Sequence, residues 1–310
     1  MITIYKTSDK GMEKQTEITS GCWVNVVDPT TDEIERMVAQ GVPQDFMTYP
    51  LDMDERPRAE KEDDGTLLVL FRIPFYEGAN TDVPYITIPV GAIITKDLFI
   101  TVSRRPNDII QDIFTRRIKG LSTAKRNRFL LHLLFSAAVK FLNYLREINK
   151  TTEQLEDELQ RSIRNNEVYG LLKYQKSLVY FRTALKGNEL MLERLQRGQL
   201  FQMFPEDEDL LEDVITENQQ AIEITNISTD ILAGMMDAFA SIISNNLNTV
   251  MKFLASITII LSLPTLVTSF YGMNVDLPLG GAWYASLAIF GFSLLLVGIV
   301  TILFLKKDWL

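Results

Sequence analysis

Two long uncharged segments near the C-terminal end restrict what this chain can fold into. Residues 253–271 supply about 19 positions, and residues 282–305 about 24, without one charged side chain. A helix of about 20 apolar residues is long enough to cross the hydrocarbon core of a bilayer. The sequence therefore predicts two membrane-spanning helices in a lipid bilayer, joined by a short loop.

The charged residues lie almost entirely before these segments. The formal net charge is -9, and only Asp276, Lys306, Lys307 and Asp308 follow residue 253. An acidic soluble part argues against binding to nucleic acid and fits a surface that meets cations. We therefore expect no nucleic acid among the partners of this chain, and the charge alone does not establish that it binds a metal ion.

A single cysteine and a single histidine limit the chemistry available to the chain. Cys22 leaves no disulfide within the chain, and His132 alone excludes any site built from several histidine ligands. We expect both side chains to pack inside the fold. The sequence shows no set of nucleophile, base and oxyanion donors, so it does not indicate an enzyme.

The part of the chain that precedes the apolar segments divides into three predicted regions. Residues 1–120 mix short period-two runs with a helix, which predicts a cytoplasmic α/β domain. Residues 121–205 repeat apolar positions every three or four residues, which predicts cytoplasmic helices. Residues 206–249 continue this pattern as a stalk helix. The individual elements are expected at 22–27, 66–73, 85–95 and 98–102 for strands and at 32–40, 126–159 and 167–197 for helices.

The predicted membrane part follows directly from the stalk. It consists of a first, pore-lining transmembrane helix (250–271), an outer loop (272–281), a second transmembrane helix (282–305) and a basic tail (306–310). The loop has no lysine or arginine, whereas Lys306 and Lys307 follow the second span. By the positive-inside rule both termini face the cytoplasm of a multi-pass protein in the inner or plasma membrane.

One side of the first span combines small and weakly polar residues. A hairpin of two helices cannot enclose a polar path, so these residues would line a pore only if several copies surrounded one axis. Small residues also let membrane helices pack closely without a pore, and this alternative stays open. The stripe consists of Asn248, Met251, Ala255, Thr258, Ser262, Thr265 and Ser269.

The stripe carries no charged group, which constrains what could pass along it. Mg²⁺ gives up its water ligands reluctantly, so we expect a largely hydrated cation, contacted through its waters. Met251 and Leu254 could form a hydrophobic constriction that closes by dewetting. A divalent ion gains roughly 4.6 kcal/mol in falling through 100 mV, so uptake needs no pump.

The segment at residues 271–274, Tyr-Gly-Met-Asn, lies between the two spans. In this position it resembles the CorA family of divalent-cation channels, whose hallmark is a Gly-Met-Asn tripeptide at the outer end of the first span. The runs at 248–252, 23–26 and 56–58 also look like features of that family. The resemblance implies a funnel-shaped homopentamer with an N-terminal α/β domain, long stalk helices and a central pore lined by the first spans.

The resemblance also implies roles for particular residues. Gly272, Met273 and Asn274 would form an outer ring that receives hydrated Mg²⁺, and Asn248 and Met251 would match the inner constriction. In the outer loop only Asp276 is acidic, so less charge than usual gathers cations at the mouth.

In the family, Mg²⁺ held between neighbouring cytoplasmic domains keeps the channel shut. Asp213 matches the stalk carboxylate of that regulatory site. The usual acidic partner falls on Tyr49 in this sequence, so we expect Asp52 and Asp54, with Glu55 nearby, to substitute for it.

The sequence thus predicts a CorA-like channel that moves hydrated Mg²⁺ down its electrochemical gradient and is gated by cytoplasmic Mg²⁺. Two alternatives remain. The same fold could transport Co²⁺, Ni²⁺ or Zn²⁺, although a pore without cysteine or histidine disfavours tight binding of such ions; a hydrated path also admits Co²⁺. The chain could instead be a membrane-anchored coiled-coil scaffold that conducts nothing.

Overall fold

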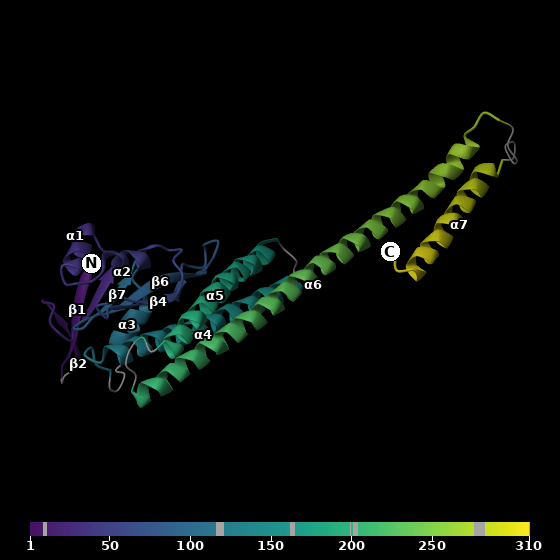
Figure 1. The fold of residues 1–310 in the computed structure, drawn as a ribbon. Coiled ribbons are helices and arrows are strands. Elements are labelled where there is room, and N and C mark those ends of the chain that lie inside the picture. The colour runs from purple at the N-terminus through teal and green to yellow at the C-terminus, as the bar shows by residue number, and fades with distance from the viewer. Residues whose placement is uncertain are drawn as a thin grey trace. The chain divides into compact units, whose positions relative to one another are not determined.

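The computed structural model describes residues 1–8, 11–115, 121–161, 165–198, 200, 204–275 and 283–309. The chain divides into two compact units, Met1–Met235 and Met236–Leu310. The 67-residue helix α6 (Pro205–Tyr271) contributes its first part to one unit and its second part to the other. Figure 1 shows the helices and strands of the chain.

The described part of the first unit contains a seven-stranded sheet. Its spatial order is β2-β1-β3-β7-β6-β5-β4, in which β3 and β7 are parallel and the other neighbours antiparallel. Only the β3–β7 pair needs a long crossover, which is provided by the intervening helices and strands. The strands are β1 (Ile2–Ser8), β2 (Gly11–Gln15), β3 (Trp23–Val27), β4 (Arg58–Lys61), β5 (Leu67–Tyr76), β6 (Tyr85–Ile94) and β7 (Phe99–Ser103).

The central strands are buried on both faces, which explains their nearly continuous apolar sequences. Successive side chains of a strand point to opposite faces. Trp23 accordingly joins a cluster with Phe99 and Phe129, whereas the adjacent Val24 joins a second cluster with Met37 and Ile100. The sheet is thus the middle layer of the first unit.

Helices cover both faces of this sheet. The cluster around Val24 includes residues of the short helices α1 (Thr31–Val38) and α2 (Gln44–Thr48), which is followed by the 3₁₀ turn η1 (Tyr49–Leu51). The cluster around Trp23 includes residues of α3 (Asp108–Thr115), α4 (Arg126–Arg161), α5 (Asn165–Arg197) and the start of α6. Leu211 and Val214, in the second and third turns of α6, thereby anchor the start of this helix in the core of the first unit.

The strongly periodic elements were predicted correctly, with ends shifted by a few residues. They include four of the strands, helix α1 and the long helices α4 and α5. Strands β1, β2 and β4 and the helices α2 and α3 were not anticipated. The reason is clearest for β2, whose five residues are all exposed or half-buried and show no apolar alternation. Cys22 is fully buried, as expected, and His132 is half-buried.

Three described helices are long and apolar enough to cross a membrane, judged by length and composition alone. They are α4, α6 and α7 (Ala285–Lys306). The apolar window of α4 is 61% buried, whereas those of α6 and α7 are 11% and 6% buried. The apolar side of α4 therefore packs in the core of the first unit. The apolar surfaces of α6 and α7 are left mostly uncovered by the described residues.

A close approach between α5 and the loop before β4 gives a first prediction. A Cβ atom added at Gly187 would lie 2.8 Å from Cγ of Pro57, whereas one added at the helical Gly234 would meet nothing within 4 Å. We expect Gly187→Ala to lower the stability by about 1–3 kcal/mol, because the proline ring must move. As the control, Gly234→Ala should be neutral or stabilising by up to about 1 kcal/mol. Thermal unfolding of the detergent-solubilised chain measures both, and equal effects would contradict the packing.

Candidate functional site

In the second unit, α7 returns alongside the C-terminal part of α6. The short connection after Tyr271 joins the two helices at one end. At the other end, the Ser256 hydroxyl donates to the carbonyl oxygen of Lys252 (2.8 Å) and lies 3.4 Å from that of Trp309. Ser256 and Val267 of α6 and Ser293 of α7 are buried, and they define the face along which the helices meet.

The small and weakly polar stripe lies on the other side of α6. All seven of its residues, from Asn248 to Ser269, are exposed. At 3.6 residues per turn, the centre of the stripe is roughly 140° around the helix from the centre of the buried face. The residues that sequence analysis singled out are thus brought onto one face, and that face is not covered by α7.

Three hydroxyl groups of this stripe share one orientation, with the proton directed at the backbone of α6. Thr258 donates to the carbonyl oxygen of Leu254 (2.8 Å) and Ser262 to that of Ile259 (2.8 Å). Thr265 donates in the same way to Leu261 (3.3 Å). Because each hydroxyl proton is used within the helix, the oxygen lone pairs remain available as acceptors on the exposed side. The stripe therefore presents acceptors that carry no net charge.

An open hollow follows the outer half of the stripe. Its volume is about 780 Å³, and it is lined by Ser262, Thr265, Leu266, Ser269, Phe270 and Met273. Beyond it, α6 ends with the amide of Gly272 donating to the carbonyl oxygen of Thr268 (2.9 Å). Gly272, Met273 and Asn274 are exposed, whereas Asp276 lies outside the described residues.

The predicted regulatory carboxylates occupy exposed positions in the first unit. Asp52 and Asp54 lie in the loop between η1 and β4, and Asp213 lies on α6. Carboxylate oxygens are the ligands that Mg²⁺ prefers, so their chemistry fits this ion. Within one chain, however, the described residues contain no group of three or more histidine, cysteine, aspartate or glutamate side chains placed to hold a metal ion.

The loop between η1 and β4, here called the acidic loop (residues 52–57), is hydrogen-bonded by Arg72. Sequence analysis did not identify this residue. Nη1 of Arg72 donates to the carbonyl oxygens of Met53 and Glu55, at 2.9 Å each. Nε and Nη2 donate to the hydroxyl (2.9 Å) and carbonyl (2.7 Å) of Thr87. Burial lowers the pKa of Arg72, and the negative charges of Asp54 and Asp52 oppose this change. The sequence did contain a signal for this role, because Arg72 is the one charged residue in the apolar run of β5.

Asn188 of α5 fixes the backbone of Arg72. Its Oδ1 accepts from the Arg72 amide (2.9 Å), and its Nδ2 donates to the Arg72 carbonyl oxygen (2.8 Å). Strand β4 pairs with β5 only as far as Arg58 opposite Leu70. The amide side chain therefore takes the place of a strand partner where the edge of β5 would otherwise be unpaired.

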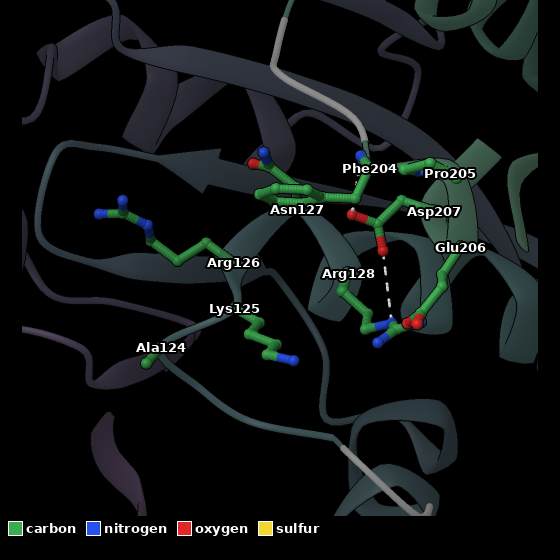
Figure 2. Close-up of a pocket in the computed structure, with 9 residues that line it drawn as sticks. All are labelled: Ala124, Lys125, Arg126, Asn127, Arg128, Phe204, Pro205, Glu206 and Asp207. Carbon is green, nitrogen blue, oxygen red and sulfur yellow. Dashed lines mark hydrogen bonds and ion pairs between the residues drawn. The ribbon is translucent and has the colours of Figure 1, made fainter.

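A second cavity, of about 650 Å³, lies where α4 and α6 begin. Figure 2 shows the side chains of Glu206 and Asp207 converging on Arg128 within this pocket. Arg128 Nη2 lies 2.7 Å from Glu206 and Nε lies 3.3 Å from Asp207. Burial and the charge of Arg128 lower the pKa of His132, one turn along α4, while Asp207 opposes the shift. These contacts tie the first turn of α6 to α4.

The two carboxylates on Arg128 give a second prediction. The side chain of Asp207 is 7% exposed and that of Glu206 is 76% exposed. Asp207→Asn should therefore destabilise the protein by about 1–3 kcal/mol, since it weakens a buried charge-assisted contact. Glu206→Gln is the control and should cost less than about 0.5 kcal/mol, because exposed pairs contribute little. Thermal unfolding of both variants is the measurement, and similar losses would contradict this anchoring.

Comparisons with known proteins point to the same family over nearly the whole chain. Residues 19–307 match the sequence model of a family described as CorA-like Mg²⁺ transporter protein. The chain is 27% identical over 299 residues to the cobalt/magnesium transport protein CorA of Methanocaldococcus jannaschii, covering 93% of this chain and 91% of that protein. It is 23% identical over 297 residues to the protein of the same name from Thermotoga maritima, covering 93% and 83%.

The fold is similar to that of solved structures. The complete structure of the CorA magnesium transporter from M. jannaschii matches with a TM-score of 0.88 at 24% sequence identity, covering 100% of this chain and 99% of that one. The full-length CmaX protein matches with a TM-score of 0.71 at 16% identity, covering 97% of each chain. At such identities the likeness establishes the fold, an N-terminal α/β part followed by long helices.

Proposed function

The chain belongs to the CorA-like Mg²⁺ transporter family, and from that premise we propose that it is a channel through which hydrated Mg²⁺ crosses a membrane. Helices α6 and α7 are the two spans, with both termini in the cytoplasm of a multi-pass protein of the cell membrane. Five copies surround a common axis, so that the stripe of α6 lines the pore and α7 lies outside it.

The orientation of the stripe hydroxyls is the observation that carries this proposal. Water molecules bound to Mg²⁺ direct their hydrogen atoms outward, so a wall that contacts them must accept hydrogen bonds. Thr258, Ser262 and Thr265 present such acceptors, since their own protons bond to the α6 backbone. Mg²⁺ loses water reluctantly, and contact through its hydration shell avoids that cost.

Asn274 and the backbone of Gly272 and Met273 form the outer ring in this proposal. Five amide oxygens around one axis accept from the waters of an arriving ion, while the inner constriction is formed by Asn248 and Met251. Asp276 adds the negative charge of the outer loop. The membrane potential supplies roughly 4.6 kcal/mol per 100 mV for a divalent ion moving inward.

Co²⁺ is a second cargo on the same path. The relatives from M. jannaschii and T. maritima are named cobalt/magnesium transport proteins. A hydrated-ion path selects by size and charge, and Co²⁺ and Mg²⁺ share an octahedral shell of waters. Tight binding of Zn²⁺ or Ni²⁺ would call for softer ligands than this stripe provides.

Gating by cytoplasmic Mg²⁺ completes the proposal. The exposed carboxylates of Asp213 on one copy and of Asp52 and Asp54 on its neighbour bind Mg²⁺ and thereby join adjacent cytoplasmic domains. At low cytoplasmic Mg²⁺ these carboxylates repel one another, and the domains separate. This arrangement supplies from two copies the group of ligands that the described residues of one chain do not form.

The outer ring gives a prediction for flux. Asn274→Ala should reduce Mg²⁺ uptake into liposomes at least tenfold, because five acceptors at the mouth are lost, while the oligomer remains assembled. Asn246→Ala is the matched control: Asn246 is also exposed on α6 but does not belong to the stripe. Normal flux through the Asn274 variant would count against the outer ring. A wild-type protein that passes no ion would favour the scaffold alternative.

The sensor gives a prediction that does not depend on flux. Asp213→Asn should raise the Mg²⁺ concentration that protects the purified oligomer from limited proteolysis, since a charged ligand is lost. Glu212→Gln, at the adjacent exposed position of α6, should leave that concentration unchanged. Equal responses of the two variants would remove Asp213 from the site.

A further inference from the structure

The end of α7 closes with a turn that folds the chain back onto the helix. The amide of Trp309 donates to the carbonyl oxygen of Phe304 (3.0 Å), and that of Asp308 donates to the carbonyl oxygen of Leu305 (3.4 Å). Asp308 has a left-handed backbone, with φ of 53°. This combination is a Schellman motif, which pairs carbonyl groups that a helix end would otherwise leave without a partner. Residues 307–309 therefore form a defined turn, here called the C-terminal turn.

An aromatic contact closes the C-terminal turn. The rings of Trp309 and Phe304 are stacked, with an interplanar angle of 12° and centroids 5.5 Å apart. A hydrophobic contact between these two positions often accompanies a Schellman motif, and an aromatic pair contributes more than its buried area alone. The indole ring of Trp309 consequently stabilises the bent form of the turn.

The C-terminal turn reaches α6 through Ser256. This side chain is fully buried, and its hydroxyl lies 2.8 Å from the carbonyl oxygen of Lys252 on its own helix and 3.4 Å from that of Trp309. One hydroxyl proton is thereby shared between the backbones of the two helices. The carbonyl group of Trp309 lies beyond the helix end, so a hydroxyl on the neighbouring helix is a favourable partner for it. The turn therefore joins the end of α7 to α6.

The joined position lies behind the proposed inner constriction. Ser256 follows Met251 by five residues, which places it about 7.5 Å farther along α6 and roughly 140° around the helix. Met251 is exposed on the stripe side, whereas Ser256 faces α7. Widening of a constriction formed by Met251 requires this part of α6 to move away from the pore axis, toward α7. The C-terminal turn fixes the helix that stands in the way of that movement.

We propose that the C-terminal turn is a clasp that holds the inner end of α7 against α6 and thereby supports the constriction at Met251 from behind. Trp309 and Asp308 are positioning residues: the first packs the turn against α7, and the second supplies the left-handed backbone that the turn needs. When the clasp opens, the end of α7 leaves Ser256, and α6 is free to move outward. The effect on the constriction rests on the proposed channel, whereas the clasp itself does not.

The reactivity of a buried thiol tests the clasp without any measurement of flux. In the full-length oligomer carrying Cys22→Ala, Ser256→Cys places a thiol beneath the C-terminal turn, and Ser293→Cys places one at another buried position of the same two helices. Asp308→Val should speed the reaction of N-ethylmaleimide with the thiol at position 256 about tenfold, because a β-branched residue disfavours left-handed backbone. Trp309→Ala should act in the same direction. The thiol at position 293 should change by less than twofold, which separates an open clasp from general loosening.

Two further substitutions separate the backbone of the turn from its side-chain chemistry. Asp308→Gly removes the carboxylate but adopts the left-handed conformation readily, so labelling at position 256 should be no faster than in the parent. Lys307→Val introduces the same β-branched side chain where φ is -102°, and it should change the rate by less than twofold. The clasp is overturned if Asp308→Val leaves the rate unchanged, if Lys307→Val raises it equally, or if position 293 responds as strongly.

Mg²⁺ flux into liposomes tests the support of the constriction. At a cytoplasmic Mg²⁺ concentration that closes the wild type, Asp308→Val should raise the residual flux about threefold, and Asp308→Gly should match the wild type. Faster labelling with unchanged flux would overturn the role at the constriction and leave the turn as a link between the two helices. A wild type that passes no ion would refute the proposed channel together with that role, and the labelling rates would still decide the clasp.

Discussion

The hydrogen bonds along the backbone of α6 are the interaction on which the rest of the structure depends. One continuous helix from Pro205 to Tyr271 satisfies its own backbone groups, so it can serve both in water and in hydrocarbon, where no solvent would replace a missing bond. Pro264 interrupts this pattern at one amide, yet the helix continues through it. Backbone carbonyl oxygens of α6 also accept hydrogen bonds from the hydroxyls of Thr258, Ser262 and Thr265, which leaves the lone pairs of these hydroxyl oxygens free as acceptors.

Different contacts hold the two ends of α6. At its start, Leu211 and Val214 enter the apolar core, and Arg128 binds the acidic first turn. In the second unit, the contacts with α7 occupy one face and leave the opposite one free. The proposed channel uses that free face, and the proposed sensor uses exposed carboxylates near the secured start.

Periodicity explains why much of this organisation could be predicted from the sequence. The long helices, the central strands and both apolar segments each repeat a pattern over many residues, and the resemblance at residues 271–274 is confirmed by the family match over 19–307. Strand β2 could not be found in this way, because an exposed edge strand has no apolar face to reveal it.

Sequence analysis could not predict the contacts around the acidic loop, and the reason is different. Arg72 and Asn188 are 116 positions apart, and Arg72 and Thr87 are 15 apart, so only the folded chain brings them together. The pairing of Tyr49 with Arg58 likewise depends on the turn between η1 and β4. Sequence analysis identified Asp52, Asp54 and Asp213 as candidate ligands, and their joint role remains a proposal.

Accessibility of single cysteines, introduced in a Cys22→Ala background, tests the central claim most directly, since Cys22 is the one cysteine of the chain and is buried. In reconstituted liposomes, Thr258→Cys and Ser262→Cys should react with a charged, water-soluble thiol reagent, and the reaction should block Mg²⁺ flux. Ile260→Cys and Leu263→Cys, on the side of α6 that meets α7, should neither react nor change the flux. Reaction confined to the α7 side, or labelling of the stripe without any effect on flux, would contradict a water-filled path along this face.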